Sequence, residues 1–171
     1  MKDYDIVVIG AGAAGMMAAI AAGRRGCRVC IVERNEKPGK KIYITGKGRC
    51  NITNACDMEE LFQNVMTNHK FMYSSFYRFT NEDVIAFFEK EGLPIKVERG
   101  NRVFPVSDKS SDVIRVLSEA CRKCGVKILF HSRVKSILFD RDVLQSVKGV
   151  RLADGREITA SQVIVAAGGR S

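Results

Sequence analysis

Residues 4–33 read YDIVVIGAGAAGMMAAIAAGRRGCRVCIVE. The apolar run over residues 4–9 has the β-branched bias of a buried parallel strand, and it ends abruptly at Gly10. Good helix formers occupy residues 16–22, and a second apolar run over residues 28–32 ends at Glu33. We therefore predict strand, glycine turn, helix and strand, the opening unit of a doubly wound, Rossmann-like α/β domain.

The glycine turn has the spacing G-x-G-x-x-G over residues 10–15. In such a turn Gly10 permits the tight bend, Gly12 lets a pyrophosphate approach the backbone, and Gly15 lets the helix pack closely on the strand. The helix N–H groups and dipole attract the phosphates, and Glu33 can accept hydrogen bonds from a ribose diol. A purely structural glycine turn is the weaker interpretation, because the strand, the helix and the acid are all present. The pattern predicts a dinucleotide site without deciding between FAD and NAD.

Length and composition fit a globular protein. The chain has 171 residues, of which 46% are hydrophobic, so it can bury a sizeable core as one domain. No apolar run approaches the length that crosses a membrane, and the first residues do not read as a signal peptide. We expect a cytoplasmic protein that has no membrane partner.

The chain is basic, with a net charge of +9 from 28 Lys and Arg against 19 Asp and Glu. Such a balance suits nucleic acid, an anionic cofactor or a solvated surface. The basic residues are dispersed apart from residues 37–41 and 47–49, and no stripe of aromatic residues accompanies them. Cofactor phosphates explain these two clusters better than RNA does, so we expect a small-molecule substrate rather than a nucleic-acid partner.

Six cysteines form two C-x-x-C pairs, at residues 27/30 and 121/124, together with Cys50 and Cys56. Disulfides are not expected in a cytoplasmic chain. The two pairs stand too far apart for a zinc ribbon, so we predict ordinary burial and no metal site. Cys50 follows an arginine, which leaves a redox thiol of low pKa as an alternative to packing.

The rest of the chain divides by pattern. Residues 35–56 form a long, polar, glycine-rich connector that suits contact with an extended polar cofactor. Residues 57–91 have helical spacing, and we expect the aromatic cluster over residues 71–79 to pack in a core rather than line a substrate pocket. Residues 133–160 alternate between turns, which predicts a three-stranded antiparallel meander, followed by a buried parallel strand over residues 163–167.

Three segments carry a resemblance to a known family. Residues 39–41, GKK, and 45–54, TGKGRCNITN, closely resemble the signature G-[RK]-K…[ST]-G-x-G-R-C-N-x-[ST]-N of bacterial and archaeal NAD(P)/FAD-dependent oxidoreductases. This family includes aminoacetone-oxidase-family FAD-binding enzymes and bile-acid-reductase-like flavoproteins. Residues 102–109, RVFPVSDK, are similar to its V-F-P-x-S-[DN] segment. Residues 163–171, VIVAAGGRS, resemble its A-T-G-G-x-S motif, except that Ala167 replaces the usual threonine.

The resemblance implies an FAD-binding domain of the glutathione-reductase type, in which the strand after residue 125 lies beside the strand that precedes Glu33. The glycine loop would hold the FAD pyrophosphate, Glu33 the adenosine ribose, and Lys40 or Lys41 the ribose or phosphates. Residues 48–51 would pass close to the flavin, while backbone at Val134 would pass the adenine. The implied cofactor-binding residues are Gly10, Gly12, Ala13, Ala14, Gly15, Glu33, Arg34, Lys40, Lys41, Gly48, Arg49, Cys50, Asn51, Val134, Ala167 and Gly168.

The same resemblance implies the N-terminal part of a flavin-dependent oxidoreductase that transfers hydride between reduced NAD(P)H or substrate and a small-molecule acceptor. Reduction of an activated carbon–carbon double bond is the implied reaction, for which we assign no proton donor. In the family the polypeptide continues past the glycine pair and returns to complete the FAD fold. A C-terminal region or self-association is therefore expected to complete this fold. Two alternatives remain, an FAD-dependent RNA-modifying enzyme and a truncated, non-catalytic nucleotide-binding module.

Overall fold

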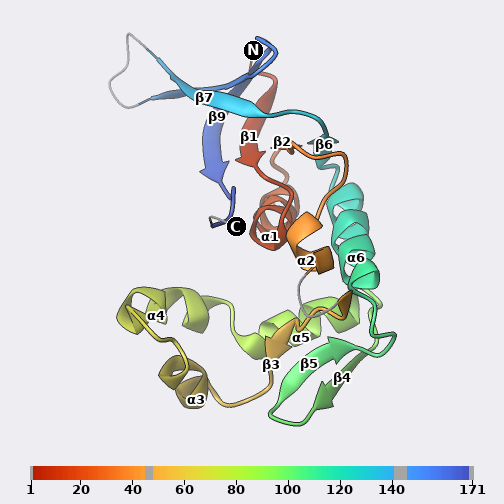
Figure 1. The fold of residues 1–171 in the computed structure, drawn as a ribbon. Coiled ribbons are helices and arrows are strands. Elements are labelled where there is room, and N and C mark those ends of the chain that lie inside the picture. The colour runs from red at the N-terminus through yellow and green to blue at the C-terminus, as the bar shows by residue number, and fades with distance from the viewer. Residues whose placement is uncertain (1, 45–47, 141–145, 170–171) are drawn as a thin grey trace. The chain divides into compact units, whose positions relative to one another are not determined.

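The computed structural model describes residues 2–44, 48–140 and 146–169. They form two compact units, one of residues 1–42 with 117–171 and one of residues 43–116. The middle segment builds a sheet of its own, while the single domain expected from length stays a prediction. Figure 1 colours this second unit from orange to green. The signature residues 45–47 and the closing residues 170–171 lie outside the described residues.

The first unit is built on a six-stranded sheet with the order β6-β2-β1-β9-β8-β7 (Figure 1). Its parallel part consists of β6 (Lys127–Leu129), β2 (Val29–Val32), β1 (Tyr4–Ile9) and the second half of β9 (Glu157–Val165). β1 is central, since Val7 pairs with Cys30 on one side and with Val163 on the other. The Rossmann-like prediction is confirmed, including the place of β6 beside β2.

Two helices accompany this sheet. α1 (Ala13–Gly23) packs on β1 and β2 because Met16, Ala19 and Ile20 fall on one buried face. The last turns of α6 (Ser110–Lys123) also belong to the first unit, where the Cys121 thiol donates to the Met16 carbonyl at 3.8 Å. Neither helix, nor any other in the described ranges, is long and apolar enough to span a membrane.

The predicted antiparallel meander is present as β7 (Val134–Phe139), β8 (Val147–Leu152) and the start of β9. The predicted start of its middle strand, over residues 143–145, lies outside the described residues. The predicted parallel strand over residues 163–167 is present up to Val165, but it is neither separate nor fully buried: β9 is continuous and pairs with β8 up to Thr159 and with β1 from Ala160. Beyond Thr159 its outer edge meets no other described strand, and Val165 near its end is 64% exposed.

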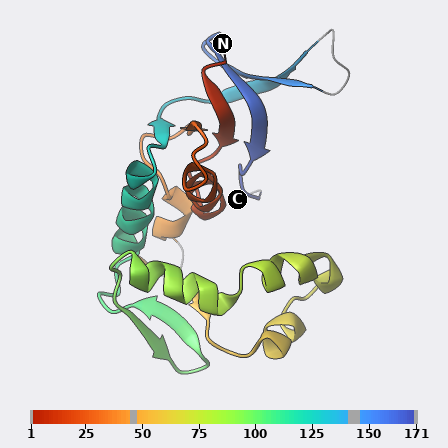
Figure 2. The same cartoon turned by 180° about the vertical axis from the view of Figure 1, so that it is seen from behind.

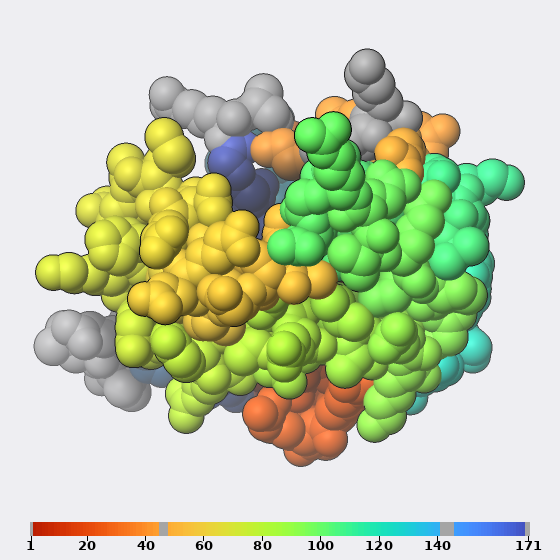
Figure 3. Space-filling view, turned by 90° about the horizontal axis from the view of Figure 1, so that it is seen from below, coloured from red at the N-terminus to blue at the C-terminus, as the bar shows by residue number. Residues whose placement is uncertain are grey.

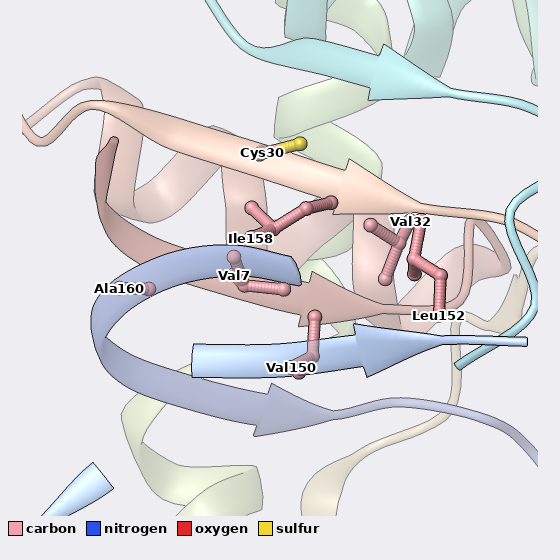
Figure 4. Close-up of a cluster of buried hydrophobic side chains, with 7 residues drawn as sticks. All are labelled: Val7, Cys30, Val32, Val150, Leu152, Ile158 and Ala160. Carbon is pink, nitrogen blue, oxygen red and sulfur yellow. The ribbon is translucent and has the colours of Figure 1, made fainter. Parts of the chain in front are cut away.

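One apolar cluster joins the meander to the parallel strands. It is drawn in Figure 4 and consists of Val7, Cys30, Val32, Val150, Leu152, Ile158 and Ala160. The residues come from β1, β2, β8 and β9. Fully burying one such aliphatic side chain contributes roughly 1.5–3 kcal/mol, so this cluster fixes how β9 enters the sheet.

The second unit has a three-stranded antiparallel sheet, with β5 (Arg102–Pro105) between β3 (Thr53–Asn54) and β4 (Ile95–Glu98). α5 (Asn81–Lys90) begins with a capping box of Thr80 and Asp83 and packs against β3 and β4. Figure 2 shows α5 beside the β4–β5 hairpin. The connector is therefore not wholly irregular, since it contains β3 as well as the short helix α2 (Lys40–Ile44).

Residues 57–91 resolve into α5 and two further helices, α3 (Met58–Gln63) and α4 (His69–Arg78). The expected core packing of the aromatic cluster is wrong, because α4, described throughout, buries none of its residues and Phe71 is 83% exposed. Four rings instead stack on one another with centroids 4.6–5.7 Å apart, and they belong to Phe62, Tyr73, Phe76 and Tyr77. Figure 3 shows the surface of this unit in yellow to green.

Candidate functional site

The turn between β1 and α1 is shaped by three glycines with different surroundings. A Cβ at Gly10, where φ is +104°, would lie 2.6 Å from the Ala166 carbonyl oxygen. A Cβ at Gly15 would lie 1.9 Å from the Gly10 carbonyl oxygen, closer than side chains pack. At Gly12, by contrast, no described atom lies within 4 Å of such a Cβ. Packing thus requires glycine at two positions, while the third faces open space.

The N-terminus of α1 offers hydrogen-bond donors to that space. Gly12 is the N-cap, no side chain of the described residues caps the helix, and its first turn has no acidic residue. The first intrahelical bond runs from Met16 N to Gly12 O at 2.9 Å, so earlier N–H groups of this turn have no intrahelical acceptor. Ala13 and Ala14 are exposed. Free N–H groups, a positive dipole end and open space fit the pyrophosphate of a dinucleotide.

Glu33 lies directly after β2 and binds the glycine loop. Its Oε2 accepts a hydrogen bond from Ala11 N at 2.7 Å, and its Oε1 accepts two from Asn35, from N at 2.9 Å and Nδ2 at 2.6 Å. A carboxylate has about four acceptor positions, so one remains for a ribose hydroxyl. The ribose contact stays a prediction, whereas the bond to Ala11 shows that Glu33 also fixes the loop.

The segment after Glu33 returns to the glycine loop. Gly39 N donates to Ala11 O at 2.8 Å, which places the start of α2 near the turn. Lys40 Nζ lies 3.5 Å from the Asn35 Oδ1 atom, and Lys40 and Lys41 are both exposed. Arg34 is exposed as well. The predicted basic side chains of this segment therefore remain accessible to an anion.

The carboxyl ends of the parallel strands supply the other predicted contacts of the first unit. Ala166 N donates to Ile9 O at 2.9 Å, so Ala167 and Gly168, both exposed, follow β9 beside the glycine turn. Figure 1 shows β1 and β9 pointing the same way toward this edge. Val134 begins β7, is half-buried, and packs against the apolar cluster of Figure 4. Ligands of open α/β sheets bind at this edge.

The remaining predicted residues, Gly48, Arg49, Cys50 and Asn51, lie in the second unit. Cys50 is 8% exposed, and burial raises its pKa, which opposes the alternative of a low-pKa thiol. Asn51, with its amide oriented to donate, has Nδ2 at 3.2 Å from Val103 O and 2.9 Å from Thr53 O. Arg49 is engaged by carboxylates of its own unit. These residues thus form a braced segment along β5.

Two cysteines of the first unit, Cys30 and Cys121, are packing residues. Cys30 and Cys121 are fully buried, and burial raises the pKa of Cys30 to about 11 and that of Cys121 to about 12. All six cysteines are free thiols. Among the described residues, no three His, Cys, Asp or Glu side chains are grouped closely enough to hold a metal ion.

Sequence reasoning missed the partners of the predicted residues. Asn35 binds Glu33 with two donors, and Asp108 binds Arg49 across 59 residues of sequence. Asn81 is buried and donates to the carbonyl oxygens of Asn54 and Cys56, both at 2.7 Å, which ties α5 to the connector. Asp108 lies in the V-F-P-x-S-[DN] segment, so the sequence marked this residue but did not indicate that it binds Arg49.

Comparisons with known proteins agree with this geometry. The model of one family, described as the HI0933-like protein Rossmann domain, matches residues 4–171. The ribosomal RNA dihydrouridine synthase of Escherichia coli (strain K12) is 32% identical over 172 residues, covering 100% of this chain and 41% of the relative. The 3-dehydro-bile acid delta(4,6)-reductase of Clostridium scindens is 36% identical over 169 residues, covering 97% and 39%. The chain thus spans about two fifths of these relatives' length.

Solved structures confirm the fold. The 3-ketosteroid-delta4-(5alpha)-dehydrogenase from Rhodococcus jostii RHA1 has a TM-score of 0.69 at 18% identity, covering 96% of this chain and 46% of that chain. The THI4 protein of Thermovibrio ammonificans also has a TM-score of 0.69, at 14% identity, covering 96% and 57%. At such low identities the likeness is one of architecture, and it supports the Rossmann-like prediction.

Proposed function

Since the chain belongs to the HI0933-like family of Rossmann-domain proteins, we propose that it is the FAD-binding portion of a flavin-dependent oxidoreductase that reduces an activated carbon–carbon double bond. The observation that carries the proposal is the uncapped N-terminus of α1, where Gly12 faces open space. This arrangement supports a bound pyrophosphate, and the fold is that of flavoenzyme FAD domains.

Each part of the site has a binding role under this proposal. When bound, FAD supplies hydride transfer at its flavin ring. The N–H groups at the start of α1 bind the pyrophosphate, and Glu33 holds the loop through Ala11 while its remaining acceptor position takes a ribose hydroxyl. Backbone at Ala167 and Gly168 supports the dinucleotide. We assign no residue as proton donor, and NAD(P)H as the source of electrons is part of the proposal.

The type of reaction is inferred from the two relatives. Dihydrouridine differs from uridine by two hydrogens added across a ring double bond, and a delta(4,6)-reductase acts on double bonds of a bile acid. Both products are explained by hydride addition to a carbon–carbon double bond that is conjugated with a carbonyl group. A shared FAD-binding portion is consistent with two such different substrates, because fold does not fix substrate.

An RNA substrate is the second candidate. The relative named for ribosomal RNA is 32% identical over the whole chain, and the net charge of +9 favours a polyanion. This candidate predicts RNA binding that weakens steeply between about 50 and 200 mM salt. A small-molecule reductase predicts no retention of RNA at either salt concentration.

FAD titration of the 171-residue chain tests the proposal. At about 100 times its dissociation constant, FAD adds about 2.7 kcal/mol of stability, which raises the melting temperature by about 5–10 °C. Gly12→Val should abolish this shift because its side chain fills the phosphate space. It should hardly change the ligand-free melting temperature, because φ −82° and ψ −175° suit valine and no described atom is within 4 Å.

Ala21→Val is the matched control, since it introduces the same side chain at an exposed position of α1 away from the turn. This variant should bind FAD as the wild type does. Unaltered FAD binding by Gly12→Val would contradict the assignment of the pyrophosphate site. A folded wild-type chain that does not bind FAD would contradict the proposal for this chain and favour either a non-catalytic module or a site that a C-terminal region completes.

A further inference from the structure

We infer that Arg49 is a positioning residue, held by Asp108 and Glu98 over the ring of Phe104, and that it sets the course of segment 48–54 rather than contacting a cofactor phosphate. The inference deepens the proposed function, and it rests on that function only in the test that measures FAD binding. All the residues involved lie in the second unit.

The backbone around Arg49 needs support. Gly48 has φ +84° and Cys50 has φ +62°, so left-handed conformations stand on both sides of the arginine. A non-glycine residue in this region costs on the order of 1–3 kcal/mol and persists only where its surroundings hold it. The buried Cys50 side chain holds one side of the segment. The side chain of Arg49 holds the other.

The guanidinium is bound from three directions. Nε and Nη2 donate to Asp108 Oδ1 at 2.9 and 2.6 Å, and Nη2 also donates to Glu98 Oε1 at 2.6 Å. The Phe104 ring lies 4.3 Å below the guanidinium carbon, within cation–π range. A planar fork that binds carboxylates and stacks on a ring is a geometry that lysine cannot reproduce.

Lys96 completes a compensated network. Its Nζ lies 2.7 Å from Asp108 Oδ2 and 3.3 Å from Glu98 Oε1, so two cations share two carboxylates. The four charges sum to zero. A phosphate approaching Arg49 would therefore meet two carboxylates within 2.6 Å of the guanidinium, and their repulsion opposes direct binding.

Segment 48–54 is then tied along β5. Ile52 N donates to Val103 O at 2.8 Å, Ala55 N donates to Asn101 O at 2.7 Å, and β3 pairs with β5. Arg49 is the first of these ties along the segment. Its loss should release residues 48–51 while the β3–β5 pair remains.

The experiment compares Arg49→Ala, Asp108→Asn, their double variant and Arg49→Lys. Asparagine tolerates the left-handed backbone at position 108, where φ is +56°, so this change removes the charge without straining the turn. Arg151→Ala is the control, because Arg151 forms an exposed pair of similar geometry with Glu157 at 2.7 Å in the first unit.

Amide hydrogen exchange of the ligand-free chain is the first readout. We expect Ile52 N, whose bond to β5 lies nearest Arg49, to exchange at least about tenfold faster in Arg49→Ala and in Asp108→Asn, with no further increase in the double variant, while Ala55 N beyond β3 exchanges as in wild type. Arg49→Lys should behave like Arg49→Ala, and the control like wild type. Unchanged exchange in Asp108→Asn would overturn the inference, whether or not the chain binds FAD.

The FAD dissociation constant is the second readout and separates positioning from direct contact. Positioning predicts that the dissociation constant rises by about tenfold in both single variants and no further in the double variant. A tenfold change is the scale that we expect when a binding group is misplaced. Direct phosphate contact predicts unchanged or tighter binding in Asp108→Asn and retained binding in Arg49→Lys, and this result would overturn the inference. If wild type fails to bind FAD, the proposed function fails and hydrogen exchange alone decides.

Discussion

Replacing Glu33 with alanine should destabilise the first unit even before any cofactor binds. Glu33 is 7% exposed, and its carboxylate accepts one hydrogen bond from Ala11 N and two from Asn35. Ala11 is fully buried, so alanine at position 33 leaves an amide N–H in the interior without an acceptor. The two donors of Asn35 are half-buried and can turn toward water.

The magnitude follows from these three bonds. A hydrogen bond to a charged group contributes about 1.5–3 kcal/mol, and a buried donor left unpaired costs about 1–3 kcal/mol. With the Ala11 bond counted in full and the Asn35 bonds in part, the loss is about 3–4 kcal/mol. In a domain of this size 1 kcal/mol shifts the melting temperature by about 2–4 °C, so Glu33→Ala should melt about 6–16 °C lower.

Thermal unfolding followed by circular dichroism without FAD measures this loss. Glu36→Ala is the matched control, since Glu36 is an exposed carboxylate three residues further along the same segment, and it should melt with the wild type. Glu33→Gln should fall between the two, because its amide keeps one acceptor but turns a donor toward another N–H. A Glu33→Ala chain that melts with the wild type would refute the bracing role.

Three further predictions follow from other contacts. Gly15→Ala should lower the free energy of unfolding, measured in urea, by about 2–3 kcal/mol, because its Cβ would lie 1.9 Å from the Gly10 carbonyl oxygen. Gly12→Ala should lower it by less than about 1 kcal/mol. Equal losses would contradict the close packing described at Gly15. Hydrogen bonds from Lys96 and Arg49 lower the pKa of Asp108 below 3.8. The ionised carboxylate therefore stabilises the fold above about pH 5, and this contribution is lost as the pH falls through the lowered pKa. Melting temperatures measured against pH should therefore fall more steeply in acid for wild type than for Asp108→Asn, and parallel curves would contradict the network. Burial raises the pKa values of Cys30 and Cys121 to about 11 and 12, so these thiols should resist iodoacetamide at about pH 8 while the half-exposed Cys27 and Cys124 react. Peptide mass spectrometry measures the labelling of each cysteine. Early labelling of Cys30 would contradict its burial and show that the interior opens.

Local signals were enough to predict the dinucleotide turn. The apolar run before Gly10, the glycine spacing and the acid at residue 33 act within one βαβ unit, so neighbouring residues determine the structure. The same holds for the meander, whose alternation fixes which side chains face the core. These elements appear with their expected order and pairing.

Features that depend on distant partners could not be predicted. The continuity of β9 is decided by β1, which pairs with residues 160–165 far away in the sequence. That Arg49 contacts a cofactor stays a prediction. Its partners in the structure, Glu98 at the end of β4 and Asp108 in the turn after β5, lie 49 and 59 residues further along the chain, and no local pattern connects them to it.

The central place of β1 has a consequence for folding during translation. β2 is synthesised soon after β1, but the partner of β1 on its other side, residues 160–165, emerges more than 150 residues later. At about 5–20 residues per second, this interval lasts roughly 8–30 s. During that time one edge of an apolar strand has no partner and is available to chaperones or to a neighbouring nascent chain. The strand order therefore leaves the parallel sheet incomplete until residues 160–165 have been synthesised.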